Sequence, residues 1–141
     1  MRTRLSLVAL LFLSVSGAMA CGTYTDPILA PTAATLPRVV NFVSRIQEHG
    51  SAWRSFVATA GDVSVQLTSV SQGAVVMGLG LGTIDGTNCV LTKSVEAPPE
   101  GTTVAPQITA TLPAGTYCVK IWDIGNLTSI ADFSIAITFP S

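Results

Sequence analysis

The chain has 141 residues, a formal net charge of −1 and charged side chains at only 11% of its positions, against roughly 25% in an average globular protein. Basic residues form no cluster anywhere in the sequence. Because binding to phosphate backbones needs clustered Lys and Arg, this composition argues against a nucleic-acid partner and against attraction to anionic membrane surfaces.

The first 20 residues have the three parts of an export signal. Arg2 and Arg4 precede an apolar run from Leu5 to Val15, and the small-residue exit Ala18-Met19-Ala20 follows it. The run is too short to span a bilayer permanently, which takes roughly 20 apolar residues. We therefore expect residues 1–20 to be a signal peptide that is removed on export. Its removal takes the formal charge from −1 to −3, because it carries two arginines and no acid.

Cys21 follows the expected cleavage site, and two interpretations of it stay open. The segment Ala-Met-Ala-Cys is similar to the bacterial lipobox, which predicts diacylglycerol attachment at Cys21 and a lipid anchor in the cell envelope. The lipobox pattern favours Leu where Ala18 stands and a small residue where Met19 stands. The spacing of Ala18 and Ala20 suits ordinary signal peptidase equally well, and the protein would then be secreted freely.

Residues 21–37 form the expected linker. Pro27, Pro31 and Pro37 lie there among Thr and Ala, without any apolar period. Such a composition is typical of an extended spacer. We expect the folded domain to occupy residues 38–141, which is a common size for a single domain.

The rest of the chain alternates apolar and polar residues with a period of two, as half-buried strands do. The last segment is the clearest, since Phe133, Ile135, Ile137 and Phe139 share one face. Short strands with turn residues between them indicate an all-β, antiparallel β-sandwich or barrel of about eight strands. The inward face of residues 53–58 stays open between the Trp53/Ser55/Val57 set and the Arg54/Phe56 set. We expect strands over residues 39–48, 53–58, 63–68, 75–82, 89–91, 107–112, 116–123 and 133–139, with an exposed loop over 96–103.

A row of glycines and two tryptophans are the candidates for a ligand surface. Gly78, Gly80 and Gly82 leave one face of a strand bare, which suggests close approach by another backbone, a bulky side chain or a ligand. Strict alternation turns Trp122 outward. It either covers these glycines as packing or joins Trp53 as a stacking platform for sugar or peptide.

Cysteine usage predicts one disulfide. An exported chain folds in an oxidising compartment, so two of the three cysteines should pair. Cys89 and Cys118 both lie in or beside expected strands and are the predicted pair. Closing a loop of about 30 residues should stabilise the fold by roughly 3–4 kcal/mol. Cys21 is then left over.

The segment Leu112-Pro113-Ala114-Gly115-Thr116-Tyr117-Cys118-Val119-Lys120-Ile121, taken with residues 61–67 and 133–139, resembles the bacterial pre-peptidase C-terminal domain. It is also similar to small exported bacterial proteins of unknown role that carry a GTYCV…D.GN segment. The resemblance covers roughly residues 42–140 and implies a jelly-roll-like β-sandwich, usually appended to a secreted hydrolase. No catalytic domain is expected before it here, so the accessory role does not carry over directly. Tyr117 also fits a tyrosine corner, with its hydroxyl meeting the turn near Pro113.

Motifs for catalysis or cofactor binding are missing from the sequence. The single histidine, His49, is expected in a turn beside Gly50, and no Gly-x-Ser-x-Gly elbow accompanies it. Zinc ligands, a P-loop and a dinucleotide fingerprint are also missing, so we expect no metal and no cofactor. Calcium held by acids at strand ends is an alternative that no Asp-x-Asp spacing supports. Those acids are Asp85, Glu96, Glu100, Asp123 and Asp132.

The sequence therefore predicts an exported, non-catalytic β-sandwich protein of the cell envelope, anchored through Cys21 or secreted. We expect an adhesion or accessory binding module, whose partner is a polysaccharide or a protein at the cell surface. The alternative is a carbohydrate-binding module that uses Trp122 or Trp53.

Overall fold

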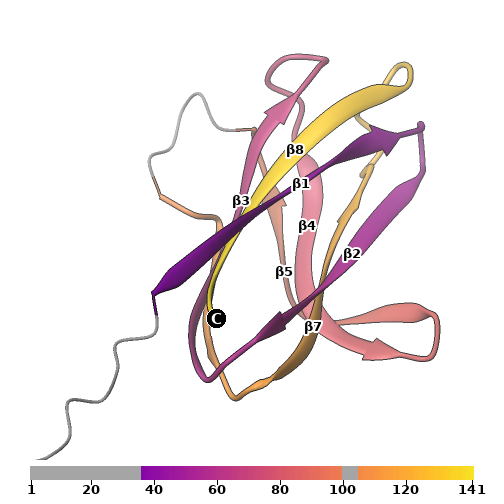
Figure 1. Ribbon diagram of the computed structural model, residues 1–141. Helices are drawn as coiled ribbons and strands as arrows, with labels where there is room; N and C mark the ends of the chain where they lie inside the picture. The colour runs from indigo at the N-terminus through magenta and orange to yellow at the C-terminus, as the bar shows by residue number, and fades with distance from the viewer. Residues whose placement is uncertain (1–35, 100–104) are drawn as a thin grey trace, which may run out of the picture. The chain divides into compact units, whose positions relative to one another are not determined.

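The computed structural model describes residues 36–99 and 105–141, and all regular elements in these ranges are β-strands (Figure 1). The expected signal peptide, most of the linker with Cys21, and Glu100 lie outside the described residues. No described segment forms a helix that is long and apolar enough to cross a membrane. The strands are β1 (Pro37–Ile46), β2 (Ser51–Ala58), β3 (Gly61–Val70), β4 (Met77–Asp85), β5 (Asn88–Ala97), β6 (Ile108–Leu112), β7 (Gly115–Trp122) and β8 (Ala131–Pro140).

The strands form two four-stranded antiparallel sheets. Sheet A has the order β1-β8-β3-β6, and sheet B has the order β2-β7-β4-β5. Strands β4 and β5 follow each other in the chain and pair within sheet B. Every other connection between consecutive strands crosses from one sheet to the other. This order is the jelly roll, which confirms the predicted fold class.

The core lies between the two sheets, and the period of two accounts for it. Ile135 and Ile137 of β8 and Val65 of β3 are fully buried, while their sequence neighbours face outward. In sheet B, Phe56 is buried and packs against Phe139 with ring centroids 4.9 Å apart. Phe56 and Arg54 therefore occupy the inward face of β2, which settles the choice that the sequence left open. Each such buried side chain contributes about 1.5–3 kcal/mol of transfer free energy.

The expected loop over residues 96–103 begins too early, because β5 continues to Ala97. The register of β4 and β5 shifts between Leu81 and Gly82, so that Thr92 is an extra residue in β5 and its hydroxyl bonds the Leu81 carbonyl at 3.1 Å. Such a bulge bends a strand without ending it. The alternation of apolar and polar residues is interrupted at this bulge, because Lys93 takes an inward position opposite Leu81.

A basic side chain bridges the two edge strands on each open side of the sandwich. The edge strands are β1 and β6 in sheet A and β2 and β5 in sheet B. On one side, Arg54 Nη1 of β2 donates to the backbone carbonyl of Asn41 in β1 at 3.1 Å. On the other, Lys93 Nζ of β5 donates to the Thr109 carbonyl in β6 at 2.7 Å. Inward charges on edge strands also oppose edge-to-edge aggregation.

Candidate functional site

Cys89 and Cys118 form the predicted disulfide, with Cα atoms 5.8 Å apart. The bond joins β5 to β7, although β4 lies between these strands in the sheet. It crosses near Gly82, which pairs with Cys118, and a Cβ on Gly82 would overlap the carbonyl oxygen of Val90. The β5 backbone therefore folds over β4 where only glycine fits. Disulfides form and persist in oxidising compartments, so this bond agrees with the expected export of the chain.

Trp122 lies over Gly78, as the packing alternative predicts, but it does not cover the rest of the glycine row. A Cβ on Gly78 would overlap the indole of Trp122, and a Cβ on Gly80 would approach the methyl groups of Leu91 to 2.7 Å. The two side chains fill the space that the missing Cβ atoms leave. Trp122 is half-buried, and one face of its indole is taken by Gly78.

Trp53 is the exposed tryptophan of the pair. It lies on β2, directly opposite Lys120 of β7, and 37% of its surface is exposed. Both tryptophans point to the outer face of sheet B from adjacent strands. The structure thus brings the two candidate stacking residues to one face but leaves Trp53 as the more accessible ring.

Two predicted structural roles have their expected geometry. The Tyr117 hydroxyl donates to the Pro113 carbonyl at 2.7 Å, which completes the tyrosine corner. His49 lies in the turn between β1 and β2 with a φ of 55°, and its backbone N–H donates to Asp123 Oδ2 at 2.8 Å. This contact uses the main chain of His49 and leaves its imidazole exposed.

Asp123 organises the loop between β7 and β8. Its Oδ1 accepts the backbone N–H groups of Gly125, Asn126 and Leu127 at 2.9, 2.9 and 3.1 Å. Burial acts to raise the pKa of Asp123, but the four backbone donors, His49 included, outweigh it and lower the pKa from 3.8 to about 2. Both oxygens of Asp123 accept backbone N–H groups, so its side chain holds the conformation of this loop.

The other predicted acids are separated. Asp132 accepts from Arg45 Nε at 2.8 Å in an exposed ion pair, Asp85 ends β4, and Glu96 lies on β5. Within residues 36–99 and 105–141, no three His, Cys, Asp or Glu side chains come together in a way that could hold a metal ion.

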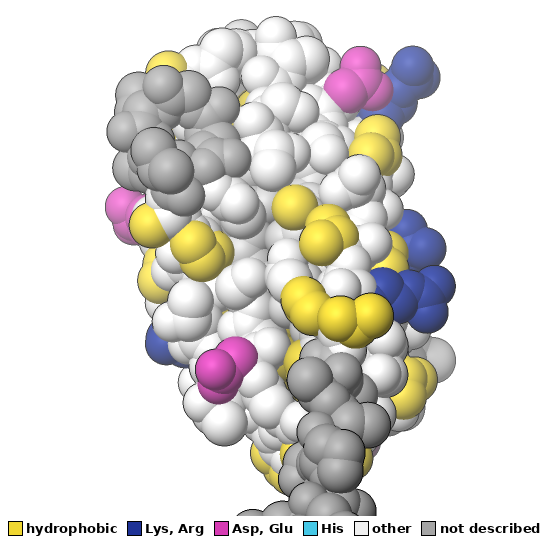
Figure 2. Space-filling view, turned by 60° about the vertical axis from the view of Figure 1, so that its left-hand side comes forward, with side chains coloured by type: hydrophobic (Ala, Val, Ile, Leu, Met, Phe, Trp, Pro, Cys, Tyr) yellow, Lys and Arg dark blue, Asp and Glu magenta, His cyan; other side chains and the backbone are white. Residues whose placement is uncertain are grey.

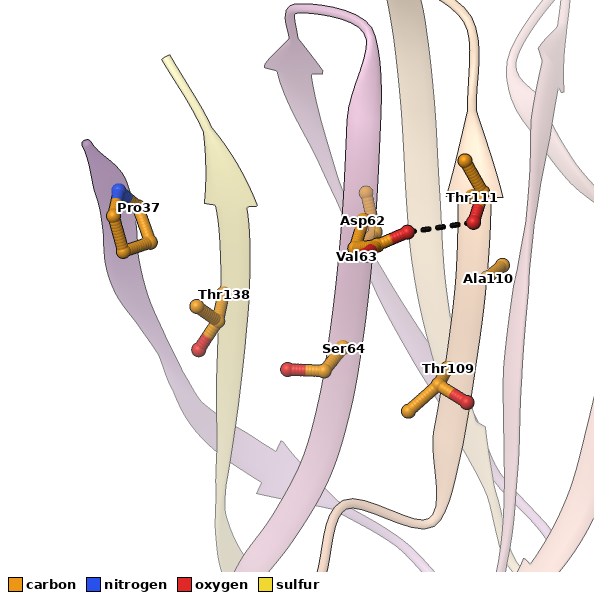
Figure 3. Close-up of a pocket in the computed structure, with 8 residues that line it drawn as sticks. All are labelled: Pro37, Asp62, Val63, Ser64, Thr109, Ala110, Thr111 and Thr138. Atoms are coloured by element: carbon orange, nitrogen blue, oxygen red, sulfur yellow. Dashed lines mark hydrogen bonds between the residues drawn. The ribbon is translucent and has the colours of Figure 1, made fainter. Parts of the chain in front are cut away.

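The structure reveals a further surface, the outer face of sheet A. A hollow of about 570 Å³ lies over it, lined by side chains from β1, β8, β3 and β6. Figure 3 shows Pro37, Thr138, Ser64 and Thr109 in a row across these four strands, with their side chains directed out of the sheet. All four are short, so hydroxyl groups and one proline ring line an open, shallow surface.

Charge is low on this face. Among its described residues, Asp62 Oδ1 accepts the Thr111 hydroxyl at 2.6 Å, and Arg45 pairs with Asp132. Val39 and Val43 lie on the same outer face along β1, with Val39 directly opposite Thr138, and they are 60% and 67% exposed. Figure 2 shows this side of the molecule, where white and yellow atoms fill the middle and the blue and magenta side chains lie around it.

The alternation of hydroxyl and apolar residues predicts which side chains leave the sheet, but it does not predict which strands are neighbours. Ser64, Thr109 and Thr138 come from distant parts of the chain and meet only because β3 lies between β6 and β8. This face therefore has no signal in the sequence pattern of any single strand.

The described residues define a jelly-roll β-sandwich protein. No protein-family model and no curated protein matches the sequence, so the resemblance to the pre-peptidase C-terminal domain stays a prediction. Among solved structures, the chain is similar to the Yersinia pseudotuberculosis-derived mitogen, with a TM-score of 0.53 and 18% identity over 74% of this chain and 87% of that one. It is also similar to the Aeromonas hydrophila periplasmic inhibitor of g-type lysozyme, with a TM-score of 0.49 and 13% identity over 71% and 84%. The likeness to the mitogen shows a shared fold.

Proposed function

We propose that this chain is an exported, non-catalytic binding protein that recognises a protein partner through the outer face of sheet A. The observation that carries the proposal is the hollow of about 570 Å³ on a face whose charged groups are already paired or hydrogen-bonded. Protein interfaces are depleted of charged residues at their centre. A surface that becomes buried in such an interface loses its water, and this costs little free energy where few charged groups lack a partner. Exposed Val39 and Val43 add apolar area to the same face along β1.

A non-catalytic role agrees with how the chain uses its titratable groups. The backbone of His49 holds a turn, and Asp123 has its oxygens engaged by backbone N–H groups. Export agrees with the Cys89–Cys118 disulfide and with the expected signal peptide.

Site-specific photo-cross-linking in the producing cells tests the proposal. A photoreactive residue replaces Thr138 on the outer face of sheet A or, as the control, Ser94 on the outer face of sheet B. We expect a discrete protein adduct from position 138, suppressed by excess unlabelled protein, and none from position 94. Adducts of equal yield from both positions, or from neither, would contradict the proposal.

A lipid anchor at Cys21 is the second part of the proposal. Because Cys89 and Cys118 bond to each other, Cys21 is the third cysteine without a partner in the described fold. Diacylglycerol attachment would occupy it and tether the domain to the envelope. Mass spectrometry of the mature N-terminus should show an acylated Cys21, whereas a free thiol at that position would establish a secreted protein.

Carbohydrate binding is the second candidate function, and the exposure of Trp53 on the outer face of sheet B favours it. An exposed indole beside Lys120 offers a stacking surface with a hydrogen-bond donor. A glycan array with the wild-type protein and the Trp53→Ala variant decides the matter. Binding that disappears in the variant supports this candidate, and no glycan binding by the wild type removes it.

A further inference from the structure

A groove follows the open side of the sandwich between β1 and β2. The two strands diverge from their common turn (Figure 1), and a hollow of about 280 Å³ lies between them. β1 is the edge of sheet A and β2 is the edge of sheet B, so both present backbone groups that pair with no neighbouring strand among the described residues. Exposed edges of this kind accept extended peptides by hydrogen bonding to their main chain.

Two arginines line this groove. Arg38 lies on β1 opposite Phe139, and Arg54 lies on β2 opposite Val119, so both take inward positions on their strands. Arg54 donates to the Asn41 carbonyl at 3.1 Å, which holds its guanidinium at the groove and leaves other N–H groups to donate. The side chain of Arg38 makes no hydrogen bond or ion pair with any residue in the described ranges.

Arg45 lies on the same strand as Arg38 but, unlike Arg38, has an acidic partner. Its side chain points to the outer face of sheet A and is neutralised by Asp132 at 2.8 Å. The chain has seven basic residues in all, so two arginines in one small groove, neither paired with an acid among residues 36–99 and 105–141, are a local concentration of charge. Guanidinium groups match carboxylates in geometry and bind them through charge-assisted hydrogen bonds.

The floor of the groove is apolar. Phe56 and Phe139 form it with Val40, and exposed Val57 stands at its border. A ligand that fits must therefore offer carboxylates to the two arginines and apolar side chains to the floor. An extended peptide in which acidic and apolar residues alternate carries both kinds of side chain within one short segment.

We propose that the groove between β1 and β2 binds an extended, acidic segment of a partner protein, with carboxylates held by Arg38 and Arg54. The site is distinct from the outer face of sheet A, and the proposal does not depend on that face binding anything.

Fluorescence anisotropy tests the groove with a labelled short peptide in which glutamate alternates with valine. A peptide with glutamine in place of glutamate is the ligand control. Arg38→Gln removes one cation of the groove, and Arg45→Gln removes the same charge from the same strand outside it. We expect wild-type protein to prefer the glutamate peptide, Arg38→Gln to weaken its binding about tenfold, and Arg45→Gln to leave binding within about twofold.

Three results would overturn the proposal. The first is equal binding of the glutamate and glutamine peptides, and the second is an equal loss in Arg38→Gln and Arg45→Gln, which would indicate diffuse attraction of charge. The third is self-association of Arg38→Gln with undiminished peptide binding, which would make Arg38 a guard of the β1 edge instead. In wild-type protein, the peptide should also shift the amide signals of Val40 and Val57 but not of Thr138.

Discussion

The contact between Trp122 and Gly78 predicts that Gly78→Ala destabilises the protein when Trp122 is present and stabilises it when Trp122 is replaced by alanine. Gly78→Ala places a methyl group where the indole now lies, so the indole has to leave the sheet surface. A tryptophan side chain buries about 150–250 Å², and displacing this half-buried one exposes on the order of 100 Å². At ~25 cal/mol per Å², the substitution should lower the free energy of unfolding by about 2–3 kcal/mol.

In a Trp122→Ala background the same substitution should be stabilising. Without the indole, Gly78→Ala only removes chain entropy from the unfolded state, which is worth about 0.5–1 kcal/mol. Urea unfolding of the wild type, both single variants and the double variant gives the coupling free energy directly.

Trp53→Ala is the control background, because Trp53 projects from edge strand β2, which is not paired with β4. There Gly78→Ala should cost as much as in the wild type. Should Gly78→Ala be equally destabilising with and without Trp122, the glycine would not be making room for the indole.

Three further predictions concern stability. Replacing both Cys89 and Cys118 by Ser releases a loop with a sequence separation of 29 and should lower the free energy of unfolding by roughly 3–4 kcal/mol in urea titrations; an unchanged midpoint would contradict this. Because the pKa of Asp123 is lowered to about 2 from 3.8, its stabilising effect is complete above about pH 4 and is lost as pH falls toward 2. Asp123→Asn should flatten this acid limb of the stability profile, and a limb of unchanged depth would show that other carboxylates cause it. Tyr117→Phe removes the hydroxyl bond to Pro113 and should cost about 1 kcal/mol in urea unfolding, whereas no loss would mean that the corner does not stabilise the fold.

The sequence predicts the faces of the strands well because a period of two is a direct consequence of burial on one side of a sheet. Ile135 and Val65 are buried as expected, and Trp122 points outward. The tyrosine corner and the disulfide were also predictable, since each depends on one or two residue types with a specific role.

Strand order and the extent of β5 were harder to predict from the residues. Lys93 at an inward position and the bulge at Thr92 interrupt the alternation, so that only the first residues of β5 resemble a strand. Pairings such as Ser64 with Thr138 join residues far apart in the chain, and local patterns carry no information about them. The same holds for Arg38 and Arg54, which become one site only when the two edge strands face each other.

The most direct measurement is the affinity of the purified partner, obtained from the cross-linked adduct, for variants of the two outer faces. Thr138→Arg introduces a charge at the hollow on sheet A, and Ser94→Arg introduces the same charge on sheet B. We expect Thr138→Arg to weaken binding more than about tenfold and Ser94→Arg to leave it within about twofold. Equal affinities of the two variants would show that the outer face of sheet A is not where the partner binds.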